Sequence, residues 1–483
     1  MSLILLLFIL VIFALDRVLS KLSNDSLPWY LNTAVWLLLP WAICALAFAL
    51  PIIVHRERLE YVHVSYIALC LLCCVCGSWI GYFKKNKINY YLKSETDSAP
   101  KINIGIIAAL GIVGQAASIY DNIATTGISF GDRLFGSGLN AARELNFSMQ
   151  QQQIVGPFHL LEILSGLSII YLIYYINFII FKPTLQANKK FHPLIAGFTF
   201  LLILINSLLI SGGRIGLILL IMILFMVILF DKDKSMLKIF WHYSQMKKIA
   251  LIVFFSTFIV ALAGYMATAY VEKRSNQSLP LASLNLAHRA DIVPAVFFYT
   301  KDISSLRYGI FTLSYLTTPL ATFALYFDLP SKSMPGPFFG QYNFPGVADR
   351  IVKRIDISSF RLWWDARLEL FQPLTRDGYG GNVWPTILRD IAADVGWGLV
   401  PVVMFLIGFA SSVISRSAYL TGNPFKIAIA SAMLCICAFS AFHSVIYLGS
   451  VAGLLFYGAV FLAYPSVSKF LSFKKLMRPR RIN

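Results

Sequence analysis

One arginine at the edge of an apolar run is the first residue in this sequence placed to do chemistry. It lies in "SGGRIGLILLIMILF", where Arg214 follows two glycines and precedes the run. A guanidinium is costly inside hydrocarbon, so we expect Arg214 at the water-facing end of a membrane span. There it either snorkels to the surface while Ser211 caps the helix, or it joins free backbone N–H groups in an anion site. In the second case its planar fork matches phosphate oxygens.

Further cationic and imidazole side chains lie in polar segments that are expected to stand outside the membrane. Each is alternatively an ordinary ion-paired surface residue. Several of them converging on one cleft would bind a diphosphate and stabilise it as a leaving group. On this basis Arg289 is a candidate catalytic residue, and the candidate substrate-binding residues are Arg143, His288, Arg376 and Arg389.

Aromatic residues are concentrated in two stretches of the same long polar segment, "FRLWWDARLEL" (360–370) and "RDGYGGNVWP" (376–385). Flat aromatic faces beside carboxylates and amides suit sugar rings. Trp363, Trp364 and Asn382 are therefore candidate substrate-binding residues, and packing of the segment's own small core is the alternative. The seven cysteines fall inside apolar runs. "CLLCCVC" has no histidine or acidic partner, so we interpret it as apolar packing and expect no metal and no cofactor.

The composition predicts an all-α polytopic membrane protein. Of 483 residues, 58% are hydrophobic and only 13% are charged, about half the usual share. Apolar runs of about 20 residues recur, which gives about eleven spans, with ten to twelve as the range. They lie at 2–16, 30–53, 62–83, 102–120, 156–181, 193–210, 214–230, 249–270, 395–415, 426–446 and 448–465. The net charge of +18 sits largely in short loops and the tail. That distribution suits membrane lipids and an anionic substrate, and it excludes a nucleic-acid-binding surface.

Lysine-rich segments give the orientation and the domains. Segments 84–101, 182–190 and 231–248 and the carboxyl-terminal tail fall on one side, which the positive-inside rule makes cytoplasmic. We predict residues 1–270 as eight membrane helices with a smaller periplasmic loop at 121–155. Residues 271–393 form a large periplasmic loop, partly helical because so long a structureless loop is unusual. Residues 394–483 hold the last three helices and a basic tail. Within the large loop, 308–330 is either an amphipathic or re-entrant segment or a twelfth span.

The stretch "GNVWPTILRDIAADVGWGLVPVVMFLIGFA" (381–410) resembles Wzy-type oligosaccharide repeat unit polymerases, which make O-antigen or common antigen. Those proteins have a Thr or Asn in a loop, then Asp-x-Gly-x-Gly opening an apolar span with a later glycine. Their central span also starts with a Gly/Ser-Arg-Gly-like pattern, similar to "SGGRIG" here. The order of many spans and one large external loop before the last few is shared as well. The resemblance implies a GT-C-like architecture.

The function that the resemblance implies is polymerisation of undecaprenyl-diphosphate-linked repeat units at the periplasmic face of the bacterial inner membrane. The polymerase would be a metal-independent glycosyltransferase, since arginines can neutralise the departing diphosphate. A chain-length-regulating co-polymerase is the implied partner. Carried over by position, Arg214, Arg289 and Arg389 would be diphosphate ligands. Arg214 and Asp394 thereby join Arg289 as candidate catalytic residues. Asp394 aligns with the family's Asp before Gly, and we expect it to cap the amino terminus of the span that begins there.

Two other functions compete with polymerisation. O-antigen ligases carry a His-Asn or His-Ser pair about ten residues ahead of a similar Gly-x-x-Gly, but Gly381 stands here where that histidine would be. This departure disfavours a ligase and leaves the general base unassigned. A flippase or transporter would place charges near the bilayer midplane, often in repeated halves, whereas the charges here concentrate in one external loop.

Overall fold

The structure, a computed structural model, describes many of the chain's helices and several short segments between them. The described residues are 1–22, 27–83, 103–135, 145, 157–181, 193–207, 214–230, 290–292, 304–330, 336–340, 343, 369–370, 372–374, 376, 386–446 and 451–463. The predicted span at 249–270 and the lysine-rich segments at 84–101, 182–190 and 231–248 lie outside these residues.

The protein is an all-α membrane protein, with one short pair of strands added. The described residues of the predicted apolar runs are mostly helical, and the largest exception is 440–446 in the predicted span 426–446. Four of the described helices are long and apolar enough to cross a membrane, at Ser2–Ser20, Tyr61–Tyr82, Ile104–Thr126 and Trp397–Thr421. Shorter apolar helices lie at Thr33–Ala49, Leu161–Asn177, Leu194–Ile205, Ile218–Leu229, Pro424–Phe439 and Val451–Ala463.

The chain packs as two units. The first unit joins Met1–Gly81, Lys234–Ser412 and Leu434–Tyr447, and the second joins Tyr82–Asp233, Val413–Met433 and Leu448–Asn483. The helices of the first unit are α1 (Ser2–Leu22), η1 (Trp29–Leu31), α2 (Thr33–Ala49), α3 (Tyr61–Phe83), α15 (Ser304–Asp328), α18 (Ile387–Val395) and η6 (Trp397–Leu399). Those of the second are α5 (Ile104–Thr126), α6 (Phe130–Phe135), η2 (Leu161–Leu164), α8 (Ser165–Phe181), α9 (Pro193–Ile205) and α10 (Arg214–Leu229). Helices α19 (Val400–Thr421) and α20 (Pro424–Phe439) contribute to both. The predicted domain boundary at 393 falls inside α18.

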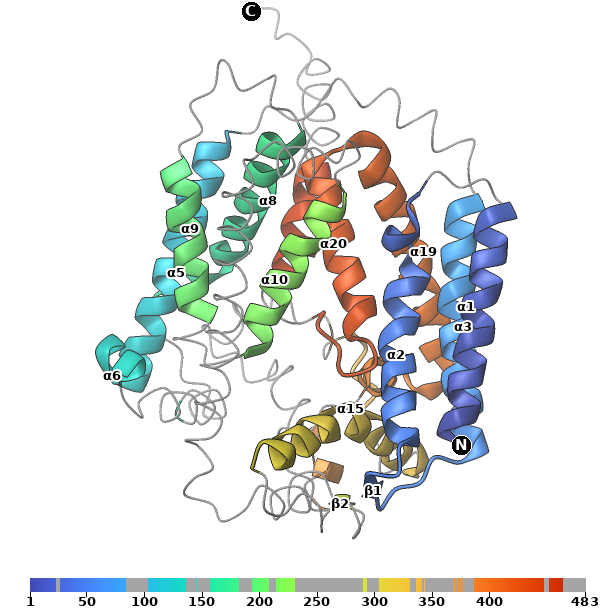
Figure 1. Ribbon diagram of the computed structural model, residues 1–483. Helices are drawn as coiled ribbons and strands as arrows, with labels where there is room; N and C mark the ends of the chain where they lie inside the picture. The colour runs from blue at the N-terminus through green and yellow to red at the C-terminus, as the bar shows by residue number, and fades with distance from the viewer. Residues whose placement is uncertain are drawn as a thin grey trace, which may run out of the picture. The chain divides into compact units, whose positions relative to one another are not determined.

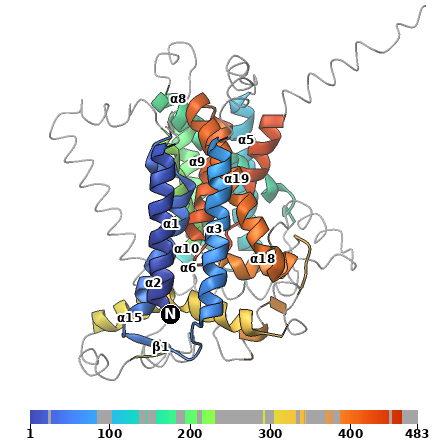
Figure 2. The ribbon, with the colours of Figure 1, turned by 90° about the vertical axis from the view of Figure 1, so that its right-hand side faces the viewer.

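In the first unit, α1, α2 and α3 run side by side, and α15 lies across one end of them (Figures 1 and 2). Strand β1 (Ile53–His55) follows α2 and pairs antiparallel with β2 (Ala290–Ile292), with Val54 opposite Asp291. This pairing holds residues 290–292 of the long polar segment beside the connection after α2. Helix α15 covers the segment 308–330, for which the sequence left open an amphipathic or re-entrant segment and a twelfth span.

Threonine side chains make the buried part of α15 compatible with an apolar setting. The hydroxyl of Thr318 donates to the carbonyl of Ser314 at 2.6 Å, and that of Thr322 donates to the carbonyl of Thr318 at 3.1 Å. These back-bonds satisfy hydroxyl groups that would otherwise be buried without a partner. Pro319 lies between them inside the helix. Polar residues can therefore face the core of the unit without a desolvation penalty.

The second unit is held by close backbone contact and by polar side chains. A Cβ added to Gly111 of α5 would lie 2.5 Å from the nitrogen of Ser168 in α8, so only glycine fits. Gln115 donates to the hydroxyl of Ser168 at 2.8 Å and accepts from the amide of Asn206 at 2.7 Å. Small residues and side-chain amides of this kind hold membrane helices together. Helix α10 of this unit begins at Arg214, the end at which the sequence placed that arginine.

A glycine seam joins α3 to α19 in the first unit. A Cβ on Gly408 would lie 1.9 Å from the carbonyl oxygen of Cys74, and one on Gly77 would lie 2.1 Å from that of Phe405. Both obstacles are backbone atoms, which cannot swing aside. The two helices therefore approach to a distance that only glycine at both positions permits.

We expect Gly408→Ala to destabilise the protein by about 1–3 kcal/mol, because the added methyl group forces the two backbones apart. Thermal unfolding of the purified protein in detergent would measure the change. Gly398→Ala is the matched control, since a Cβ there has no neighbour within 4 Å. Equal unfolding temperatures for both variants would show that the close approach of α3 and α19 does not require glycine at position 408.

Candidate functional site

A short buried helix carries the charged residues of the candidate site. Helix α18 spans Ile387–Val395, and every residue from Ile387 to Asp394 is buried. Its first N–H groups need outside acceptors, and that of Ile387 donates to the carbonyl of Ser440 at 2.9 Å. The helix ends at Val395, and Gly396 follows it with a φ of 78°, a backbone conformation that residues with a side chain rarely adopt. Asp390 and Asp394 are four residues apart and so share one face.

The two carboxylate oxygens of Asp390 each face donors. Oδ1 accepts from Arg389 Nε at 2.9 Å, and Arg389 Nη2 lies 2.6 Å from the same oxygen. Oδ2 accepts from the backbone N–H of Ser444 at 2.9 Å and lies 2.9 Å from His443 Nδ1. The Asp390 side chain has no solvent exposure. A buried charge persists only when it is paired and hydrogen-bonded, so these partners allow Asp390 to stay ionised.

Arg389 is also fully buried, and it packs against an aromatic ring as well as against Asp390. Its guanidinium carbon lies 4.8 Å from the centroid of the Tyr326 ring in α15, a cation–π arrangement. The Tyr326 hydroxyl donates to the carbonyl of Leu370. Burial raises the pKa of Tyr326 to about 12, although Arg389 acts in the opposite direction. Tyr326 is therefore a neutral phenol that supports the guanidinium.

Opposing effects set the pKa of Asp390. Burial is the largest effect and acts to raise it, but Arg389, His443 and the N–H of Ser444 together outweigh burial, and the pKa lies below its ordinary value. A carboxyl group with a depressed pKa stabilises the folded protein above its unfolded pKa, and this contribution is lost as the pH falls through the folded pKa. We infer that Asp390 stabilises the first unit at neutral pH and ceases to do so in acid.

The carboxylate of Asp394 binds an asparagine from the long polar segment. Its Oδ2 accepts from the backbone N–H of Asn343 at 2.9 Å and from Asn343 Nδ2 at 2.7 Å, and Nδ2 also donates to the carbonyl of Asp390 at 2.7 Å. The expectation that Asp394 caps the amino terminus of the following span is wrong. Asp394 lies in the last turn of α18, and Gly396 separates that helix from η6 and α19.

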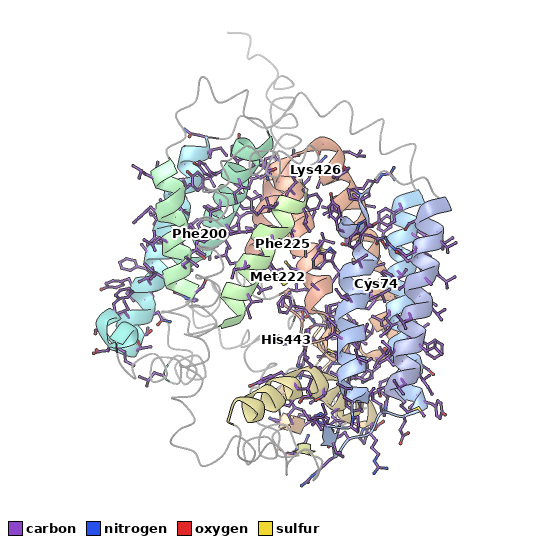
Figure 3. All side chains as sticks on the ribbon, viewed as in Figure 1. Cys74, Phe200, Met222, Phe225, Lys426 and His443 are labelled. Atoms are coloured by element: carbon purple, nitrogen blue, oxygen red, sulfur yellow. The ribbon has the colours of Figure 1, made fainter. Side chains whose placement is uncertain are left out.

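A buried break in helix structure places His443. Helix α20 ends at Phe439, residues 441–446 are not helical, and helix is resumed at Val451. The histidine lies beyond the lower end of α20 as drawn in Figure 3. His443 N–H donates to the carbonyl of Phe439, and Trp41 Nε1 donates to the hydroxyl of Ser440 at 2.9 Å. Backbone that leaves helical structure inside a membrane protein is tolerated where it is buried in protein or lines a cavity.

A second histidine–carboxylate pair lies elsewhere in the first unit. His63 Nε2 lies 2.8 Å from Asp328 Oδ1, and His63 Nδ1 accepts from the backbone N–H of Glu60 at 3.0 Å. Because Nδ1 accepts, the imidazole proton is on Nε2 and points to Asp328. The ring packs edge-on against Phe323 and Phe327. Nε2 thus joins α3 to α15, while Nδ1 accepts from the backbone at the start of α3, so both nitrogens have a structural role.

The structure brings two of the predicted site residues together. The others lie elsewhere or outside the described residues. Arg389 and Asp394 share α18 and lie beside Asp390. Arg376 is exposed on a short helical piece. Arg214 begins α10 in the second unit, but its side chain is not among the described atoms. Six more lie outside the described residues: Arg143, His288, Arg289, Trp363, Trp364 and Asn382.

Asp390, His443, Tyr326 and Asn343 are site residues that the sequence analysis missed. For His443 a signal exists, because an ionisable residue inside a predicted span marks a functional site by default, and His443 lies within the predicted span at 426–446. For Asp390 the signal is its spacing of four from Asp394. Tyr326 and Asn343 reach the site through tertiary packing that no sequence spacing encodes.

No protein-family model, curated protein or solved structure matches this chain. The likeness to the polymerases therefore depends on the motifs quoted above. In the described part of the chain, helix α18 carries motif residues, Arg389 and Asp394, whose side-chain contacts are known.

We expect Asp390→Asn to destabilise the protein by about 3–5 kcal/mol, because it leaves the buried Arg389 without a counter-charge. Arg389→Gln should cost a similar amount. The double variant should lose less than the sum, by a coupling of about 0.5–3 kcal/mol. Denaturation of the purified protein would measure all three.

Arg376→Gln is the control, because an exposed arginine should change the free energy of unfolding by less than about 0.5 kcal/mol. Strict additivity of Asp390→Asn and Arg389→Gln would show that the two side chains do not interact.

Proposed function

We propose that the protein is a glycosyltransferase that polymerises oligosaccharide repeat units carried on undecaprenyl diphosphate. It would act at the periplasmic face of a bacterial inner membrane, with a GT-C-like architecture, and make a surface polysaccharide. One observation carries the proposal. The segment with the polymerase-like pattern, 381–410, supplies the fully buried Arg389–Asp390 pair in a protein built of apolar helices. Charged groups withdrawn from water among membrane helices mark a functional site by default.

The chemistry needs neutralisation of a departing diphosphate, because the donor already carries its leaving group. We assign this task to Arg214 and Arg289 on the strength of the sequence pattern. Arg389 is less suited to it, since Nε and Nη2 of its guanidinium face Asp390. We therefore assign Arg389 to positioning Asp390.

Asp394 is assigned to positioning as well, because its carboxylate holds Asn343 against α18. The sugar and acceptor contacts are assigned to the long polar segment and the first external loop, again on sequence alone. The residues proposed there are Arg143, His288, Arg376, Asn382, Trp363 and Trp364. A co-polymerase that regulates chain length is the proposed protein partner.

Loss of the gene is expected to leave single repeats and to remove long chains. Such cells should still make lipid-linked single repeats and transfer one to the final acceptor, because neither step needs polymerisation. Electrophoresis of the surface glycan would then show one short species in place of a ladder. Re-expression of the wild-type protein should restore the ladder.

Other outcomes, with the lipid-linked intermediates analysed beside the surface glycan, would contradict the proposal. Loss of all surface glycan, with lipid-linked polymer accumulating, would indicate a ligase. Loss of all surface glycan with single lipid-linked repeats retained on the cytoplasmic side would indicate a flippase.

A further inference from the structure

We propose that the ring of Phe339 is a platform on which a sugar of the lipid-linked repeat stacks. This inference rests on the proposed function and names a substrate contact for it. Phe339 lies in the part of the long polar segment that is seated on the end of helix α18. Two observations carry the inference, the backbone conformation of Phe339 and the exposure of its side chain.

The backbone of Phe339 has a conformation that favours glycine. Its φ is 53°, and among the described residues it is the only one other than glycine with a positive φ. A bulky side chain in this region is an outlier, because its Cβ crowds a neighbouring carbonyl group. Gly336 and Gly340 also have positive φ, at 109° and 90°, so the chain uses glycine on both sides but not at position 339. Strain of this kind persists only where the surrounding structure imposes it, and it clusters at functional sites.

Helix α18 imposes this conformation. The N–H groups of Phe338 and Phe339 donate to two successive carbonyls at the end of the helix. The acceptors are Ala393 at 2.9 Å and Asp394 at 2.8 Å. Phe338 packs against the apolar cluster that includes Tyr326, whereas the side chain of Phe339 is 81% exposed. The first ring therefore anchors the turn, and the second is held away from the core.

The exposed surface around this part of the chain is polar. Among the residues from 290 to 398 whose exposure is described, Phe339 is the only large hydrophobic residue that is exposed. The polar residues exposed in the same range are Asp328, Glu369, Gln372 and Arg376. On α1, by contrast, every residue described as exposed is apolar, as expected of a helix that faces lipid. The setting of Phe339 therefore suits a hydrated ligand more than lipid tails.

A fixed and exposed aromatic ring in polar surroundings suits a sugar. One face of a sugar ring presents C–H groups, which pack on a flat aromatic face, and the hydroxyl groups lie around the edge. Phenylalanine has only two side-chain torsions, and α18 already fixes the backbone of Phe339, so little conformational entropy is lost when a ligand covers the ring. Stacking forms and breaks no covalent bond. Phe339 is therefore assigned to binding of the repeat and not to the chemical step.

The test uses the purified full-length protein and lipid-linked single repeats extracted from the deletion strain. Equilibrium binding gives Kd, and chain extension gives KM and kcat. Phe339→Leu keeps an apolar side chain but loses the flat face, so we expect Kd and KM to rise about 3–10-fold with kcat little changed. Phe339→Trp keeps a flat face and should bind the repeat as the wild type does. Leu7→Ala is the control, since Leu7 is an exposed apolar residue of α1, and it should leave Kd unchanged.

Phe339→Gly separates binding from folding, because glycine adopts a positive φ without strain. This variant should unfold at a temperature no lower than that of the wild type. It should nevertheless bind the repeats about 3–10-fold more weakly, because the ring is gone. Thermal unfolding and equilibrium binding of the same preparation measure both effects.

The outcomes separate the platform from its alternatives. Wild-type Kd and KM in Phe339→Leu would overturn the platform. If Phe339→Gly lowers the amount of protein in the membrane but leaves Kd unchanged, Phe339 anchors the protein to lipid instead. If the wild-type protein binds the repeats without extending them, the proposed function fails and Kd alone decides the platform. If the wild-type protein binds no repeats, both fail.

Discussion

A carboxylate removed from water is the constraint on which the arrangement of the first unit depends. Asp390 can stay ionised only while Arg389, His443 and Ser444 all donate to it or face it. These partners come from α18 and from the break after α20, and Arg389 in turn rests on Tyr326 of α15. One buried charge therefore ties three elements together. Replacing a buried ion pair by apolar residues is often neutral or stabilising, so stability alone does not explain why this chain keeps the cluster.

The same short helix also organises the polar segment that precedes it. Helix α18 ends with carbonyl groups that need donors, and those of Ala393 and Asp394 accept from the N–H groups of Phe338 and Phe339 at 2.9 and 2.8 Å. Gly336 sits so close that a Cβ there would lie 2.3 Å from the carbonyl oxygen of Ala393. With Asn343 on Asp394, these contacts seat non-helical backbone directly against the charged helix.

The helical membrane fold follows from the sequence, because runs of apolar residues dictate helices wherever backbone groups lack water. The site follows only in part. The motif identifies Arg389 and Asp394, but it placed Asp394 at the start of a helix. The structure has Asp394 at the end of α18, because the backbone conformation of Gly396 ends that helix, and the motif does not encode this conformation. The run around His443 looked like a continuous span because its residues are apolar on both sides. The β1–β2 pairing joins residues far apart in the chain and leaves no local signal.

The tautomer of His443 gives the most direct measurement of the charged cluster. Nitrogen-15 NMR of the protein in lipid bilayers, with labelled histidine and His443→Gln to assign the signal, reports which ring nitrogen carries the proton. At neutral pH we expect Nδ1 to be protonated and hydrogen-bonded, Nε2 to be unprotonated, and Asp390→Asn to change this signal. A proton on Nε2 at neutral pH, or a signal that Asp390→Asn leaves unchanged, would contradict the pairing of His443 with an ionised Asp390.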